Sequence, residues 1–224
     1  MNKYDVVQKI ENFAPLETQE KWDASGWIVD TQKSEINKIL FALTITDKVF
    51  EQAISQNCDM IISHHPLFFV PLEYKKINMY CAHTNLDKAD GGTTDVLIQN
   101  LGYKTTKKEE FVRIIELEKA ISINDLKIKL QTISPNLRYI NNCNQTEIKT
   151  IGFCAGSGSE FIEEYNVDAF VTGDLKFHTA LDTKKIVFDI GHFESEQFAP
   201  YLLKKITKIQ NEGVIANETS PFIY

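Results

Sequence analysis

Adjacent histidines that could bind metal follow one of the predicted strands. An apolar run at residues 58–62 ends in Ser63-His64-His65-Pro66. Successive residues of an extended strand point to opposite faces, so both histidines can share a site only where the strand ends and turns. Pro66 supplies such an ending, because it disfavours helix at His65. Neutral imidazole is the commonest metal ligand, so the doublet favours metal binding over the simple capping of a strand.

A second segment adds a histidine and a carboxylate. His83 follows a predicted strand at residues 77–82, and Asp87 comes four residues later. We place Asp87 in a loop from which its carboxylate can turn back toward the histidine doublet as a metal ligand. His83 or Asn85 can orient that carboxylate without binding the metal, or His83 can transfer protons during catalysis. The alternative is that Asp87 is an ordinary loop acid, since loops favour Asp for turn chemistry.

A third segment pairs a histidine with a glutamate. His192 follows a predicted strand at residues 186–190, and Glu196 lies four positions further on. If a helix begins here, both side chains project from one face and suit a single ion. Proline is tolerated in the first turn of a helix but breaks a helix further in, so Pro200 favours a helix that starts nearer Ser195, with His192 on the preceding loop. In either case the pair can converge, and Glu196 is the candidate for a carboxylate that bridges two ions.

A fourth segment carries polar groups that suit catalysis better than ligation. Asp174, Lys176 and His178 follow a predicted strand that ends at Gly173. We expect them to face the region between the two halves of the fold, where His178 would transfer protons and Asp174 and Lys176 would bind an anionic substrate. The alternative is a capped helix start with a solvated lysine. The glycine-rich stretch at 156–159 is too incomplete to indicate a phosphate loop.

These segments define a set of metal ligands that is larger than one ion needs. The set comprises His64, His65, Asp87, His192 and Glu196. Five ligands exceed the four of a tetrahedral ion, so we predict two divalent ions per chain. The four cysteines are widely spaced and form no Cys-x-x-Cys pair, which leaves nitrogen and oxygen ligands. Such ligands suit zinc, iron and manganese.

The elements that must position these residues occur twice. Residues 38–63 and 149–173 both begin with Lys and an apolar strand, and both continue through a helix to a second apolar strand. This repetition predicts an α/β fold of duplicated units with mixed sheets, and a dinuclear metal site between the two copies at the carboxyl ends of strands. We divide the chain into a first copy at 1–105, a connecting strand-helix-strand segment at 106–145, and a second copy at 146–224.

Helical spacing of apolar residues marks the helices that flank the strands. Among the helices that it predicts are those at residues 3–13, 47–56, 94–100, 122–133 and 159–165. Pro15 ends the first helical pattern, and Gly102 is a candidate C-terminal cap. The middle third of the chain carries no obvious chemistry.

Composition limits the classes of function. The chain is 43% hydrophobic and 25% charged, which is ordinary for a globular protein. Its formal charge of -7 argues against a general polyanion binder, so nucleic acid is not an expected partner. No window reaches the roughly 20 apolar residues of a membrane span, and residues 1–10 lack the apolar core of a secretory signal. We therefore expect no membrane association and a cytoplasmic location.

The motifs together resemble a known family. The matching stretches are Ile62-Ser63-His64-His65-Pro66, His83-Thr84-Asn85-Leu86-Asp87, Thr172-Gly173-Asp174 with His178, and Gly191-His192 with Glu196. They are similar to those of the GTP cyclohydrolase 1 type 2 family, also called NIF-three-like, over nearly the whole chain. The resemblance implies a duplicated α/β fold, a dinuclear site at the ligands named above, and a toroidal homohexamer. The chain resembles the short form, without the domain that longer relatives carry between the copies.

Three departures from the family pattern concern the shape of the cleft. The stretch Trp22-Asp23-Ala24-Ser25-Gly26-Trp27 replaces the family's Trp-Asp-Asn-Val-Gly-Leu, Thr44 stands where an Asp is usual, and a glycine-rich step is absent near 111–117. None of them removes a proposed ligand.

Two functions are consistent with these observations. The first is a metal-dependent hydrolase, with His178 or His83 as general acid or base. The family name implies that its substrate is nucleotide-like. The second is a non-catalytic metal-binding adaptor or metal carrier. Multiple turnovers would identify the hydrolase, and release of metal in a single event would identify the carrier.

Overall fold

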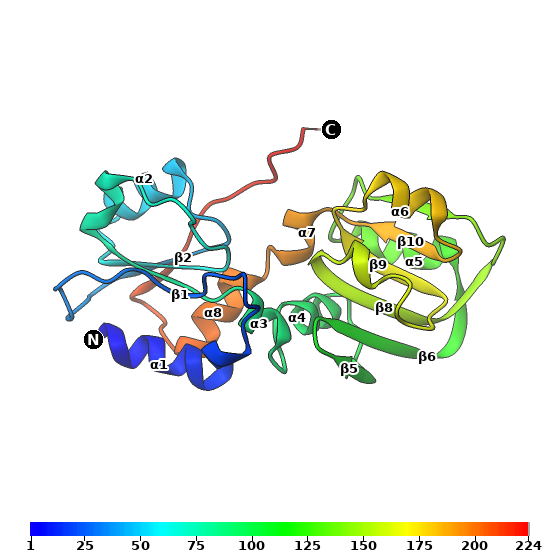
Figure 1. Cartoon of the computed structure of the whole chain (residues 1–224), viewed down its shortest axis with the longest axis horizontal. Coiled ribbons are helices and arrows are strands. Elements are labelled where there is room, and N and C mark those ends of the chain that lie inside the picture. The colour runs from blue at the N-terminus through cyan, green and yellow to red at the C-terminus, as the bar shows by residue number, and fades with distance from the viewer. Residues whose placement is uncertain (224) are drawn as a thin grey trace. The chain divides into compact units, whose positions relative to one another are not determined.

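The computed structural model describes residues 1–223 and divides them into two compact units (Figure 1). The first unit comprises Met1–Gly92 and Phe198–Thr219, and the second comprises Thr93–Gln197 and residues 220–223. Residues 198–219 return to the first unit because they form a helix and a strand that pack against its sheet. Within residues 1–223, no helix combines the length and the apolar character that crossing a bilayer requires.

The first unit is a mixed sheet with helices on both faces. Its strands are β1 (Gly26–Val29), β2 (Ile39–Ala42), β3 (Met60–Ser63), β4 (Asn78–Cys81) and β11 (Gly213–Ile215). Its helices are α1 (Lys3–Phe13), α2 (Asp47–Ser55), α3 (Thr84–Lys88) and α8 (Ala199–Thr207), with short 3-10 helices at Leu16–Thr18 and Leu72–Lys76. The strand order is β1-β4-β3-β2-β11, and only β1 runs antiparallel to its neighbour.

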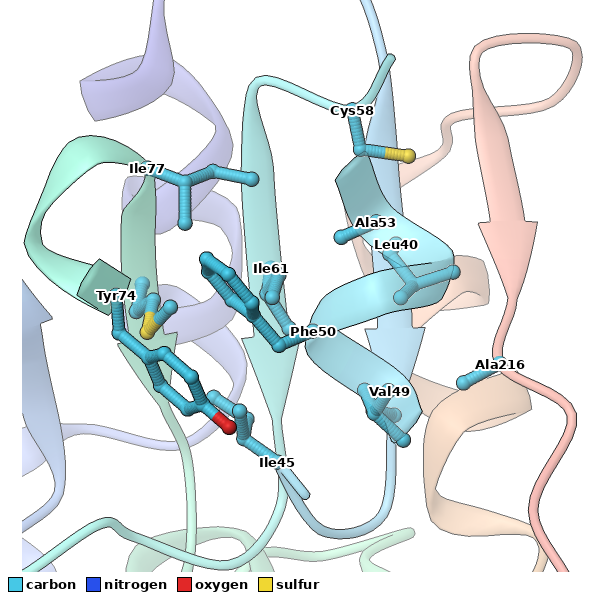
Figure 2. Packing of buried hydrophobic residues seen from close by; sticks show 12 residues of the cluster. Leu40, Ile45, Val49, Phe50, Ala53, Cys58, Ile61, Tyr74, Ile77 and Ala216 are labelled. Atoms are coloured by element: carbon cyan, nitrogen blue, oxygen red, sulfur yellow. The ribbon is translucent and has the colours of Figure 1, made fainter. Parts of the chain in front are cut away.

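The apolar core of the first unit holds β2 and β3 against helix α2. In Figure 1, α2 covers one face of the sheet, while α1 and α8 cover the other. Figure 2 shows the α2 side, where the Phe50 ring stacks on Tyr74 with centroids 4.0 Å apart and lies near Ile61. The Tyr74 hydroxyl donates to Asp47, the first residue of α2. These contacts pack α2 against β3, the strand that leads directly into His64 and His65.

The second unit is also built on a mixed sheet. Its strands are β5 (Lys107–Glu109), β6 (Val112–Ser122), β7 (Arg138–Asn141), β8 (Glu147–Ser157), β9 (Ala169–Gly173) and β10 (Ile186–Asp189). Its helices are α4 (Thr93–Asn100), α5 (Ile123–Gln131), α6 (Phe177–Asp182) and α7 (His192–Glu196), with a 3-10 helix at Ser159–Phe161. The order is β5-β6-β8-β9-β10-β7, in which β8, β9 and β10 run parallel.

Most predicted elements agree with the structure. The helix predicted at 3–13 is α1, and the α/β class with a mixed sheet in each unit is confirmed. Ser122 caps α5 through a capping box with Asp125, which is why that helix begins where the pattern places it. Gly102 has a φ of +75°, as a glycine beyond a helix end commonly does.

Three local predictions differ from the structure. Asp87 lies in the short helix α3 and not in a loop, because the backbone of the segment turns at once after β4. The helix expected at 159–165 is reduced to the 3-10 helix Ser159–Phe161. Near the C-terminus, α7 starts at His192 and a separate helix, α8, carries Pro200 in its first turn, where proline is tolerated. Pro200 therefore does not displace His192 from a helix.

Candidate metal centre

Three histidines of the first unit gather at the carboxyl ends of β3 and β4. These strands are parallel neighbours with Ser63 opposite Cys81, so the residues that follow each strand continue side by side. The ring centroids lie 5.0 Å apart for His64 and His65, 5.2 Å for His64 and His83, and 5.6 Å for His65 and His83. One ligand atom from each residue lies within 4.8 Å of the others. This cluster could hold a metal ion.

His64 is oriented by the backbone of the neighbouring strand end. Its Nδ1 donates to the carbonyl oxygen of Ala82 at 2.9 Å. A carbonyl oxygen only accepts, so Nδ1 carries the proton and Nε2 is the atom that can bind metal. The Nε2 atom lies 3.4 Å from Oδ1 of Asp87. A nitrogen and a carboxylate oxygen thus face each other within the first unit, as two ligands of one ion would.

His65 is oriented by a hydroxyl group. Its Nδ1 lies 2.7 Å from Oγ1 of Thr44. The Glu218 carboxylate accepts from the backbone N–H groups of Leu43 and Thr44 at 2.7 and 2.9 Å. Burial raises the pKa of Glu218 even though these two hydrogen bonds act in the opposite direction. The segment after β11 therefore fixes the loop that carries the partner of His65.

His83 is oriented by a buried carboxylate. Its Nδ1 donates to Oδ1 of Asp23 at 2.8 Å, and the Asp23 side chain is fully buried. Burial by itself would raise the pKa of Asp23, but hydrogen bonds from His83, Thr84 and Ser25 outweigh it and hold that pKa well below its usual range. Asp23 is therefore ionised at neutral pH, and it fixes His83 with the proton on Nδ1.

The second unit brings one histidine and two carboxylates together beyond the carboxyl ends of β9 and β10. Asp174 follows β9, and His192 begins α7 after β10. His192 Nδ1 donates to Oδ2 of Asp174 at 2.6 Å, and its Nε2 lies 3.1 Å from Oε2 of Glu196. The spacing of four residues in α7 places the last two on one face, as predicted. This unit also pairs an imidazole Nε2 with a carboxylate.

Glycine is required where Glu196 meets strand β8. Gly156 has a φ of +68°, and a Cβ added there would collide with the Glu196 carboxylate. Its N–H donates to Oγ of Ser195 at 2.9 Å, while the N–H of Gly158 donates to Oγ1 of Thr172 at 2.8 Å. Both backbone N–H groups are therefore already hydrogen-bonded to side chains of the protein and are not free to bind a phosphate. Gly156 thus leaves room for the Glu196 carboxylate, and Gly158 packs closely against Cys154 and Thr172, which gives the incomplete phosphate-loop pattern a structural explanation.

The charge on His192 leads to a prediction about pH. Burial alone would lower its pKa, but the hydrogen bonds and charges of Glu196 and Asp174 raise the pKa to about 10. Metal-free His192 is then an imidazolium at pH 8, and it must lose its proton to bind a metal ion. We expect metal binding at pH 8 to release close to one proton from His192, and the apparent affinity to increase with pH up to about 10. Calorimetric titrations in buffers of different ionisation enthalpy measure this release.

Asp174→Asn supplies the test of that cause. The variant removes one of the two charges that raise the His192 pKa, and Asn tolerates the left-handed backbone found at this position. We expect fewer protons to be released at pH 8 by this variant. Asp182→Asn, at the exposed end of α6, is the control. Equal proton release by all three proteins would contradict the assigned cause.

The remaining predicted residues lie apart from these contacts. Lys176 and His178 are exposed at the start of α6, and the His178 ring contacts Phe177 edge to face with centroids 5.5 Å apart. Asp174 was predicted to bind substrate, but its hydrogen bond to His192 also suits it to orient that ring. The structure gives Lys176 and His178 no comparable position beside a candidate ligand within residues 1–223.

Sequence reasoning assigned no role to three residues that orient the histidines. Asp23, Thr44 and Glu218 lie 60, 21 and 175 positions from their partners His83, His65 and Leu43. No helical or strand period relates such distant positions. Asp23 and Thr44 stood out only because they fall in stretches where the chain can be compared with the family pattern.

Comparisons with known proteins agree with this architecture. A family model described as Duf34/NIF3 (NGG1p interacting factor 3) matches residues 1–221. A Clostridium perfringens protein named GTP cyclohydrolase 1 type 2 homolog is 31% identical over 243 residues, covering 94% of this chain and 92% of the relative. A Campylobacter jejuni protein of the same name is 30% identical over 252 residues, covering 100% of both chains.

Among solved structures, a Bacillus cereus protein related to NIF3 superposes with a TM-score of 0.87. It covers 100% of this chain and 99% of its own, and its sequence identity of 18% makes it evidence for the fold alone. The family match extends over both units and includes every candidate metal ligand. The chain belongs to the Duf34/NIF3 family.

Proposed function

We propose that the protein binds two divalent metal ions and hydrolyses a nucleotide-like substrate. The proposed ligands are His64, His65 and Asp87 of the first unit, and His192 and Glu196 of the second. The observation that carries the proposal is shared by all four histidines at the strand ends: each contacts an oxygen through Nδ1, from a carbonyl, a hydroxyl or a carboxylate. Such partners orient metal-binding histidines and leave Nε2 to the metal.

The donor set fits a divalent ion. It consists of imidazole nitrogens and carboxylate oxygens, and the buried cysteines Cys58, Cys81 and Cys154 are not needed. These ligands suit zinc, iron and manganese alike. When bound, such ions activate water and polarise the bond under attack. The protein's own residues must then bind the substrate and transfer protons.

The exposed residues at the start of α6 are the candidates for those tasks. We propose that His178 transfers a proton and that Lys176 attracts the phosphate groups of the substrate, because both are accessible on one short segment. A local cation is needed, since the chain as a whole carries a charge of -7. His83 remains a second candidate for proton transfer. Its contacts with His64 and His65 also allow it to reach the metal itself.

The class of substrate is supported by the names of the relatives. The Clostridium and Campylobacter proteins are both named GTP cyclohydrolase 1 type 2 homolog. A purine nucleotide is therefore the first substrate to test. Fold and family do not fix chemistry, so the measured activity must decide.

Metal content tests the proposed ligands directly. Elemental analysis of protein purified without added metal is expected to find close to two divalent ions per chain, because five ligands exceed the needs of one. Glu196→Gln should lower the content of both ions if Glu196 bridges them, whereas Asp87→Asn should lower one. Glu194→Gln in the same short helix is the control. Full metal content in both ligand variants would contradict the assignment.

The alternative is a metal-binding adaptor or metal carrier. It is favoured by the exposed position of His178, which contacts no proposed ligand among residues 1–223. A carrier would release its metal to an acceptor without repeated hydrolysis. Metal-dependent turnover that exceeds one product per chain would exclude that alternative as the sole function.

The wider organisation is also a proposal. We infer that the two units are copies, because β2, β3, β4 and β8, β9, β10 both form parallel runs in chain order with an antiparallel strand beside the third. The boundaries at residues 105 and 145 rest on the repeated pattern in the sequence. A cytoplasmic location and a toroidal homohexamer follow from sequence composition and from the family resemblance.

A further inference from the structure

An exposed tryptophan, Trp22, lies beside the histidines of the first unit, and we propose that its indole ring binds the base of a nucleotide substrate by stacking. This inference rests on the nucleotide hydrolysis proposed above, and it identifies the residue that would recognise the base. The Trp22 side chain is 64% exposed, although tryptophan is highly buried on average. Its ring packs edge to face against His83, with centroids 6.1 Å apart.

The position of Trp22 places a bound base near the histidine cluster. The His83 ring lies 5.2 Å from the His64 ring and 5.6 Å from the His65 ring, centroid to centroid. Stacked carbon atoms lie about 3.5 to 4.0 Å apart, so a base on the indole would lie about 10 Å from the His83 ring. The His83 side chain is itself partly exposed, so a ligand can approach it from solvent.

The indole has a face available for stacking. The planes of the Trp22 and His83 rings meet at 74°, so the edge of one ring contacts the face of the other. His83 therefore covers at most one face of the indole, and the large exposure of Trp22 leaves the opposite face accessible. Every nucleic acid base has a flat π face, and stacking on aromatic side chains is a common way for proteins to bind bases.

The segment that carries Trp22 is held in place on both sides of the ring. Before it, the backbone N–H of Glu20 donates to Oγ1 of Thr84 at 2.9 Å. After it, the buried Asp23 carboxylate accepts from the N–H of Thr84 at 3.1 Å and from Nδ1 of His83 at 2.8 Å. These partners form the start of α3, so the loop is fixed to that helix. A ring presented in a fixed position loses little conformational freedom on binding, which favours affinity.

The surroundings of Trp22 favour a small ligand over a protein partner. Its exposed neighbours within residues 17–25 are small or polar, namely Glu17, Thr18, Lys21 and Ala24. A protein interface buries about 800 Å² on each partner and has an apolar centre. A single tryptophan can bury roughly 200 Å². That area suits one base and falls well short of an interface.

Tryptophan fluorescence tests the contact directly, because the chain has two tryptophans, Trp22 and Trp27. Trp27 is half-buried in β1, where it packs against Tyr4 and Tyr80. A purine base stacked on an indole quenches its emission. In full-length Trp27→Phe protein, as purified, we expect guanosine and GTP to quench the emission of Trp22, whereas inorganic triphosphate should not. In Trp22→Phe protein, the emission of Trp27 should not respond to any of the three compounds.

Substitutions of Trp22 distinguish a stacking ring from a side chain that is merely apolar. Loss of a stacking aromatic weakens the binding of a base about 5- to 100-fold. We expect Trp22→Leu, which is apolar but has no flat face, to raise the Kd for GTP by that factor and to raise KM with it. Trp22→Phe keeps a flat ring and should retain most of the affinity. Tyr201→Leu, which removes another exposed aromatic ring from α8, is the matched control.

The outcomes separate this inference from the proposed function. Circular dichroism and elemental analysis first establish that each variant is folded and has the wild-type metal content. If the wild type hydrolyses GTP and Trp22→Leu keeps the wild-type Kd and KM, the stacking role is wrong and the proposed function stands. Quenching of Trp22 by guanosine without any turnover would support the stacking role and contradict the hydrolase. If neither guanosine nor GTP binds the wild type, both proposals fail.

Discussion

Chelator-stripped protein is expected to lose all hydrolysis of a purine nucleotide, and metal-loaded His178→Ala is expected to retain only a small fraction of the wild-type rate. The proposed ligands lie at the carboxyl end of β3 or in the short helices α3 and α7, whereas His178 is exposed in α6, so its removal should leave metal binding intact. Loss of a general acid or base lowers rates by about 10² to 10⁴-fold. Steady-state kinetics of metal-loaded wild type and metal-loaded His178→Ala at matched metal content measure the effect of the substitution, and chelator-stripped wild type is assayed beside them.

The control for this experiment comes from the same helix. Leu181→Ala changes another exposed residue of α6 and should keep the wild-type rate. Elemental analysis must find equal metal in the metal-loaded wild type, His178→Ala and Leu181→Ala, because loss of a metal ligand would otherwise lower the rate in the same way as loss of proton transfer. Normal turnover by His178→Ala would remove this residue from the mechanism. A metal-loaded wild type that hydrolyses no nucleotide would favour the carrier.

His64→Ala is expected to lower the affinity for divalent metal at least about 100-fold. Substitutions of residues that merely support a ligand cost about 10- to 100-fold, and the loss of a ligand should reach or exceed the upper end. The variant also removes the nitrogen that lies 3.4 Å from the Asp87 carboxylate, so a second proposed ligand loses its counterpart. Competition with a chromophoric chelator measures the affinity.

This prediction requires that the variant remains folded. Alanine at position 64 removes the hydrogen bond to Ala82, but the backbone pairing of His64 with Ala42 does not depend on the side chain. The circular dichroism spectrum should therefore resemble that of the wild type, whereas the unfolding temperature should fall, because His64 is fully buried and its removal leaves a cavity. His178→Ala, a histidine-to-alanine change away from the proposed ligands, should keep the wild-type affinity. Unchanged metal affinity in folded His64→Ala would remove His64 from the site.

Much of the local structure could be predicted from the sequence because it depends on short-range patterns. The apolar spacing of α1 and α2 and the cap of α5 are encoded within one or two turns of helix. The apolar runs that become β3 and β10 lead directly into histidines, and carboxyl ends of parallel strands gather at one edge of a sheet. The candidate ligands could therefore be named before any contact was known.

The partners that orient those ligands could not be predicted in this way. Asp23 reaches His83 across 60 positions, and Glu218 reaches the Thr44 loop across more than 170. Such pairs depend on which strands become neighbours, and on the return of residues 198–219 to the first unit. Local propensity determined the strands and the residues at their ends. Strand order and long-range hydrogen bonds, which only the tertiary structure decides, determined which ring nitrogen each histidine presents.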